Sequence, residues 1–271
     1  MDNILTYVKW RKDIEFNERA FNDVDALIFA ILAYVEWDGI VGENSVNLQT
    51  AAQKFSQSKN RKDDAKRYAY SLEIPLLVKM LNNTRRYKDV KIKNYKNILD
   101  KKEEAQFAAV TFVLADNTYI IAYRGTDCSI LGWKEDFKMT YLEEIPSHKY
   151  ALAYLNEVMP SNKKKKLFSI KNKNPKDIYV VGHSKGGNLA MYATLKSPQF
   201  HEKISKVYNF DGPGFLTSFY EKNAENLPTI LPKTKMYLPS ASIIGRILEH
   251  KEEAYVIEGY ESGLMQHSAF K

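Results

Sequence analysis

The sequence predicts an α/β fold, in which a mostly parallel sheet carries helices on both faces and a helical part precedes the sheet. Three observations lead to this prediction. The first hundred residues space their apolar side chains as helices do, β-rich runs begin near Gln106, and later runs alternate with helix-like segments. Strands that alternate with helices favour right-handed crossovers and parallel pairing. A length of 271 residues fits one domain of this class.

Helical signals extend from Met1 to about Asp100. The segment NDVDALIFAILAYVEW (22–37) begins with Asn22, a good N-cap, and VNLQTAAQKF (46–55) and IPLLVKMLNN (74–83) have helical spacing. No repeat or low-complexity linker separates this part from the remainder. We therefore expect one domain over residues 1–271, with residues 1–104 as a helical part packed on a sheet region of residues 105–271.

The rest of the chain predicts strands and helices in turn. AQFAAVTFVLADNTYIIAYRG (105–125) indicates an antiparallel hairpin that turns at Asp116 and Asn117 and leads into the parallel strands. The expected elements after it are a helix in KYALAYLNEVM (149–159), a strand in DIYVVG (177–182), a helix in GGNLAMYATLK (186–196), and strands in KVYNFDG (206–212), KTKMYLP (233–239) and EEAYVIEG (252–259).

Composition narrows the function classes. The net charge is +7, but basic and acidic residues are interleaved, and the lysine block Lys163–Lys166 is typical of a solvated loop, so we expect no nucleic-acid partner. Cys128 is the single cysteine, which excludes an intramolecular disulfide and fits a reducing compartment. The first residues lack a signal-peptide pattern, and the longest apolar run, residues 26–35, is too short to span a bilayer. These features predict a cytoplasmic protein, with peripheral membrane contact left open.

The segment YVVGHSKGGNLAMYA (179–193) places a serine where a strand turns sharply into a helix. Gly182, Ser184 and Gly186 form the Gly-x-Ser-x-Gly pattern of a nucleophile elbow in its required context. The glycines let neighbouring backbones approach closely, and the N–H groups of the following helix, starting with that of Lys185, would stabilise an oxyanion. The alternative is a glycine-rich turn whose serine only caps the helix.

A second oxyanion donor is expected from YIIAYRGTDCSILGWKEDF (119–137). This segment leaves a strand at Arg124 and turns, which places Thr126 at the carboxyl end of that strand, beside Ser184 if the two strands are neighbours. Thr126 would offer its backbone N–H, and its hydroxyl remains open as a further donor. Trp133 and Asp136 would brace the loop. The alternative is an ordinary turn after an edge strand.

These motifs carry a resemblance. AYRGTDCSILGWKEDF followed by VVGHSKGGNLA resembles the class 3 lipases, with their Arg-Gly-Ser/Thr loop, downstream Trp and Asp, and Gly-His-Ser-x-Gly-Gly elbow. From Asn3 to His267 the chain resembles more closely a bacterial family of class-3-lipase-like α/β-hydrolases, a domain of unknown function, through its opening segment (3–35), VYNFDGPGF (207–215) and the late QHS (266–268). The resemblance implies an α/β-hydrolase fold and serine chemistry on small-molecule or lipid esters, without a metal or organic cofactor.

The general base is sought among five histidines. α/β-Hydrolases run serine, acid, histidine along the chain, and His267 follows the last predicted strand by a short loop, where the base of this fold belongs. Among the other candidates, His148 precedes the serine and His183 lies in the elbow. His201 lies at the amino ends of the strands, and His250 ends a helix-like stretch, SIIGRILEH (242–250).

The acid departs from the class 3 pattern. PSASIIGR (239–246) contains no carboxylate where those lipases carry an Asp, and Ser242 occupies the approximate position. Asp211 instead ends the strand next to that of the serine, so it would orient His267 through Nδ1–H. The alternatives are Asp211 as a turn residue, Glu249 as the acid, and a Ser-His dyad.

Lys185 opposes the helix dipole at the start of the predicted helix, so its side chain either serves the site, for example by binding an anionic head group, or reaches sideways to solvent. The expected activity is that of a carboxyl esterase or lipase acting through an acyl-serine. An acyltransferase or thioesterase with the same site, and an inactive hydrolase-fold binding module, are the alternatives.

Overall fold

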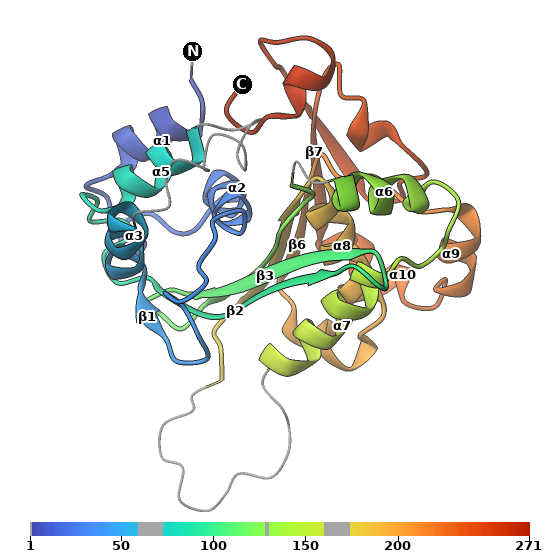
Figure 1. Cartoon of the computed structure of the whole chain (residues 1–271), viewed down its shortest axis with the longest axis horizontal. Coiled ribbons are helices and arrows are strands. Elements are labelled where there is room, and N and C mark those ends of the chain that lie inside the picture. The colour runs from blue at the N-terminus through green and yellow to red at the C-terminus, as the bar shows by residue number, and fades with distance from the viewer. Residues whose placement is uncertain (1, 59–72, 128–129, 160–173) are drawn as a thin grey trace, which may run out of the picture.

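The computed structural model describes residues 2–58, 73–127, 130–159 and 174–271. Cys128 and the lysine block Lys163–Lys166 lie outside the described residues. Within them, eight strands form one sheet in which spatial order follows chain order (Figure 1). The strands are β1 (Val46–Asn47), β2 (Lys91–Asp100), β3 (Ala105–Val113), β4 (Tyr119–Tyr123), β5 (Ile178–His183), β6 (Lys206–Phe210), β7 (Thr234–Pro239) and β8 (Glu253–Ile257).

The sheet changes direction once. β1 to β4 pair antiparallel, and β4 to β8 pair parallel. Tyr123 of β4 pairs with Gly182 of β5, and His183 pairs with Phe210 of β6. The carboxyl ends of β4, β5 and β6 therefore meet at one edge of the sheet, where ligands bind in open α/β sheets.

Helices cover both faces of the sheet (Figure 1). One buried apolar cluster joins one face to α1 (Ile4–Arg11), α2 (Asp23–Leu32), α3 (Leu48–Gln57) and α5 (Glu73–Leu81). A second cluster joins the other face to α7 (Pro146–Val158), α8 (Lys185–Leu195), α9 (Thr217–Lys222) and α10 (Leu227–Ile230), while α6 (Ile130–Met139) contacts β3. Short 3-10 turns are η2 (Pro198–Lys203), η3 (Leu231–Lys233), η4 (Ile244–Arg246) and η5 (Gly263–His267).

The predicted fold class is confirmed. Asn22 caps α2 in a full capping box, and Asn117 takes a positive φ of 69° in the turn between β3 and β4. The expected strands after residue 175 form β5 to β8. The helices of the N-terminal part pack through their apolar residues on one face of this sheet.

Two expectations were wrong. Residues 91–100, included in the helical part, form β2, because the apolar strand β3 pairs with them along nearly their whole length. A polar segment such as KIKNYKNILD has a weak strand pattern, so this long-range pairing decides its conformation. The helix-like stretch before His250 contains only the turn η4, and Phe215 pairs with Glu249 in an antiparallel bridge there.

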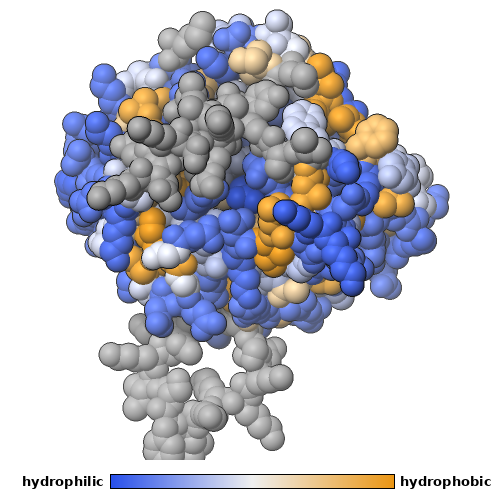
Figure 2. Space-filling model, viewed as in Figure 1, coloured by the Kyte–Doolittle hydropathy of each residue, from blue (hydrophilic) through white to orange (hydrophobic). Residues whose placement is uncertain are grey.

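Apolar side chains reach the surface in small separate patches among hydrophilic ones on the face drawn in Figure 2. Across the described parts of the chain, no helix has both the length and the apolar character that crossing a membrane requires.

Candidate active site

The site is built on the turn from β5 into α8. Ser184 stands at its crest with φ 59° and ψ −137°, a conformation that costs an L-residue about 1–3 kcal/mol. A Cβ on Gly182 would overlap the Gly186 carbonyl, and one on Gly186 would overlap the Tyr123 carbonyl of β4. The Ser184 N–H donates to the Phe210 carbonyl at 2.9 Å, which fixes the crest to β6. The serine is therefore held in a strained, rigid turn at the carboxyl edge of the sheet.

His267 reaches this edge from the C-terminal turn η5. Its Nδ1 lies 2.7 Å from Asp211 Oδ2 at the end of β6. Asp211 itself has a positive φ of 52°, and its N–H donates to the Tyr237 carbonyl of β7 at 2.8 Å. Ser242 Oγ donates to the second carboxylate oxygen and accepts from Gly245 N–H at 3.0 Å. When Asp211 Oδ2 accepts the Nδ1 proton of His267, Nε2 is the ring nitrogen that can accept a proton.

Ser184 and His267 line one cavity of about 350 Å³, together with Thr126 and Lys185. Asp211 lies behind His267, with its side chain 5% exposed, and does not line that cavity. Much of the remaining lining is apolar and includes Ile31, Ile74, Phe137, Met139, Pro213 and Ile247. The structure thus brings the predicted nucleophile, base and oxyanion donors together around an apolar space, with the predicted acid behind the base.

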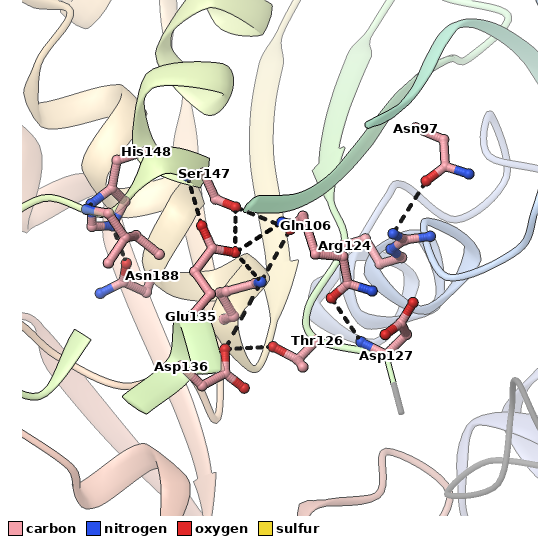
Figure 3. Close-up of polar contacts among 12 residues, drawn as sticks. Asn97, Gln106, Arg124, Thr126, Asp127, Glu135, Asp136, Ser147, His148 and Asn188 are labelled. Atoms are coloured by element: carbon pink, nitrogen blue, oxygen red, sulfur yellow. Dashed lines mark hydrogen bonds and ion pairs between the residues drawn. The ribbon is translucent and has the colours of Figure 1, made fainter. Parts of the chain in front are cut away.

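Thr126 follows β4, whose end pairs with the elbow strand. Its Oγ1 donates to Asp136 Oδ1 at 2.6 Å (Figure 3). The hydroxyl proton therefore points at the carboxylate, and the backbone N–H remains as the donor that Thr126 can offer to a substrate. Burial raises the pKa of Asp136, although the nearby Lys185 ammonium and the Thr126 hydroxyl lower it in part.

The Lys185 side chain contradicts both expectations for it. It is 1% exposed, so it neither reaches solvent nor offers its charge to a head group. Its Nζ donates to Glu135 Oε2 of α6 at 2.9 Å and to the Gln106 carbonyl of β3 at 3.1 Å. Burial raises the pKa of Glu135, but the Lys185 ammonium and hydrogen bonds from Ser147 and Gln106 outweigh burial and leave that pKa below its ordinary value. Lys185 can lie in the first turn of α8, where its charge opposes the helix dipole, because the buried Glu135 carboxylate pairs with it.

His183 connects the elbow with the segment that carries His267. Its ring is buried, with Nε2 2.8 Å from the His267 carbonyl and Nδ1 3.0 Å from the Tyr34 hydroxyl. Because a carbonyl can only accept, Nε2 carries the proton and Nδ1 accepts from Tyr34. Burial, together with the neighbouring His267, lowers the pKa of His183 to about 3. His183 is therefore neutral at pH 7 and positions the chain at His267.

The remaining candidates have structural partners. His148 is buried, with Nε2 2.7 Å from Asn188 Oδ1, and burial lowers its pKa to about 4. His201 contacts the Thr194 carbonyl, and His250 contacts Glu252. The carboxylate of Glu249 pairs with Lys251. None of these four residues lines the cavity that holds Ser184.

Three residues of the site escaped the sequence analysis. Tyr34 lies in an apolar helical run, where a tyrosine is indistinguishable from core. Gln106 is the second residue of β3, and Glu135 lies in the ordinary helix pattern of α6. The one signal in the sequence was the misplaced charge of Lys185, which required an acidic partner but did not identify it.

The fold and the strand–serine–helix turn define a class, the lipase-like α/β-hydrolase fold. The chain belongs to the Mbeg1-like family, whose model matches residues 81–271. A lipase from Rhizopus microsporus var. chinensis is 13% identical, with a TM-score of 0.50 over 88% of this chain and 74% of that chain. A mutant form of MDLA from Penicillium cyclopium is 14% identical, with a TM-score of 0.49 over 88% of this chain and 79% of that one. No curated protein matches the chain.

Proposed function

We propose that the protein is a serine hydrolase of carboxyl esters that works through an acyl-serine intermediate. One observation carries the proposal: a histidine held by a carboxylate at 2.7 Å shares a cavity wall with a serine in a strained strand-to-helix turn. Strain of this kind persists where the surrounding structure enforces it, and it gathers at active sites.

The residues supply each part of an acyl transfer. Ser184 Oγ attacks the carbonyl carbon while His267 Nε2 takes its proton, and Asp211 stabilises the imidazolium that forms. The N–H groups of Lys185 and Thr126 donate to the oxyanion. When the intermediate collapses, the bond to the leaving alcohol breaks and His267 returns the proton to it. Water then repeats the sequence on the acyl-serine and releases the carboxylic acid.

The cavity favours an apolar acyl group. Its aliphatic and aromatic lining would gain about 0.8 kcal/mol for each CH₂ that it buries, so specificity should rise along a series of longer acyl chains until the space is filled. The acidic side chains of Asp127 and Asp136 also line it and disfavour an anionic substrate there.

Esters of graded acyl length, assayed on the wild type and on three variants, test the proposal. We expect S184A and H267A to lose turnover, and D211N to lower kcat by roughly 10²- to 10⁴-fold, because the imidazole loses its orienting carboxylate. Ser58 is the C-cap of α3 and does not line the cavity, so S58A provides a matched control with wild-type kinetics. Wild-type turnover that persists in S184A would refute the proposal.

The acyl acceptor is tested separately. Product analysis with an added alcohol or thiol distinguishes hydrolysis from transfer, since transfer yields a new ester or thioester from the same acyl-serine. We expect the free acid as the main product.

A further inference from the structure

The Lys185 ammonium is enclosed by polar atoms of two other elements. Besides Glu135 and the Gln106 carbonyl, it lies 3.9 Å from Asp136 Oδ1, the oxygen that accepts from Thr126. Glu135 is fully buried and also accepts from Ser147 N–H at 2.9 Å and Ser147 Oγ at 2.7 Å. Figure 3 shows these contacts as one connected cluster. We name the ion pair of Lys185 with Glu135 the buried clamp.

Two routes run from the buried clamp to the loop after β4. The first passes through α6, where Glu135 accepts from Lys185 and the next residue, Asp136, accepts from the Thr126 hydroxyl. The second passes through Gln106, whose carbonyl accepts from Lys185 and whose Oε1 accepts from Asp127 N–H at 3.3 Å. Gln106 N–H in turn donates to Glu135 Oε2 at 3.1 Å. Two successive residues of the loop, Thr126 and Asp127, are thus connected through Asp136 and Gln106 to the side chain of Lys185.

Stability alone does not explain such an arrangement. A lysine in the first turn of α8 opposes the helix dipole, and desolvating an ion pair usually offsets its attraction, so an apolar pair of similar volume would serve packing as well. Hydrogen-bonded charged groups fix the relative positions of the segments that they join, and apolar side chains do not. The buried clamp joins α8, which carries the Lys185 N–H, to α6, whose Asp136 holds the Thr126 hydroxyl in the loop after β4.

We infer that Lys185 and Glu135 are positioning residues, whose buried clamp holds the Thr126 N–H in register with the Lys185 N–H so that both donors meet one oxyanion. The inference rests on the proposed function. A displacement of about 1 Å at such a donor costs on the order of 100-fold in rate. The buried clamp therefore acts on turnover more than on substrate binding.

Two variants and a control test the inference. K185M removes the ammonium at nearly constant length, and K185M/E135Q also removes the buried negative charge while keeping an acceptor for Ser147. Lys138 pairs with Glu104 at 2.6 Å on the same helix α6 but does not line the cavity, so K138M is the matched control. Ester hydrolysis gives kcat and KM separately, and hydrogen exchange reports the Asp127 amide.

We expect both K185M and K185M/E135Q to lower kcat by about 10- to 100-fold with KM within about 3-fold, and to exchange the Asp127 amide faster. K138M should match the wild type. Wild-type kcat in K185M would overturn the inference. So would recovery of wild-type kcat in K185M/E135Q, because the variant would then show that the unpaired charge, and not the lost clamp, slowed K185M.

If K185M does not fold, E135Q decides by the same measurements, with wild-type kcat again the overturning result. The inference and the proposed function fail in different ways. Absence of ester turnover in the wild type contradicts the proposed function, and the Asp127 amide still tests the clamp. Equal turnover in the wild type and K185M contradicts the inference alone.

Discussion

Two buried neutral histidines should make the protein lose stability as the pH falls from 7 to 5. Burial lowers the pKa of His183 to about 3 and that of His148 to about 4, against an ordinary value of 6.5. Between those values the unfolded chain binds protons that the folded chain excludes. The free energy of unfolding therefore falls as the pH drops below about 6.5.

The magnitude follows from proton linkage. At pH 5 the unfolded state gains about 2 kcal/mol from each histidine relative to pH 7, because a full pKa unit corresponds to about 1.4 kcal/mol. The two together lower stability by about 4 kcal/mol. Carboxylates whose pKa is lowered by the fold, such as Glu135 and Glu252, act in the same direction but mostly below pH 5. The raised pKa of Asp136 acts in the opposite direction, so the comparison of the wild type with H148Q is what isolates the share of His148.

Urea unfolding at pH 7 and pH 5 measures this loss in the wild type and in H148Q. Glutamine keeps a donor and an acceptor toward Asn188 and Ile145 but does not titrate, so H148Q should lose about 2 kcal/mol where the wild type loses about 4. Equal stability of the wild type at both pH values would refute the reasoning. A loss in H148Q as large as in the wild type would refute the part assigned to His148.

Three further variants probe the supports of the site. Y34F leaves His183 Nδ1 buried without its donor, so urea unfolding should show a loss of about 1–3 kcal/mol; unchanged stability would contradict the contact. S242A removes the hydroxyl that donates to Asp211, and ester kinetics should show kcat about 10-fold lower at constant KM, whereas wild-type kcat would show that Ser242 does not orient the acid. G186A forces a methyl group into a carbonyl of β4 and should cost about 3 kcal/mol in urea unfolding, and an unaltered midpoint would contradict the close approach.

The sequence predicts most of the sheet that carries the site, because the signals there are local. β-Branched and aromatic runs give β3 to β8, and the glycine spacing around Ser184 gives the turn. β2 escaped prediction because its polar residues become a strand through pairing with β3, a partner that no local pattern reveals.

Contacts between site residues that lie far apart in the sequence were harder to predict. Tyr34 comes from the helical N-terminal part and meets the elbow 149 residues later in the chain, so only the packed fold brings them together. The partner of Lys185 was hidden for the same reason, since Glu135 precedes it by 50 residues on another helix. Residue types and spacing predicted a hydrolase-like site, while its supports depended on tertiary contacts.

The central claim is that Ser184 is a nucleophile activated by His267, and covalent labelling with a fluorophosphonate followed by peptide mapping tests it most directly. We predict one adduct per chain, located on Ser184, absent from S184A and formed much more slowly in H267A. No adduct on the wild type, or an adduct that maps to another residue and persists in S184A, would contradict the claim.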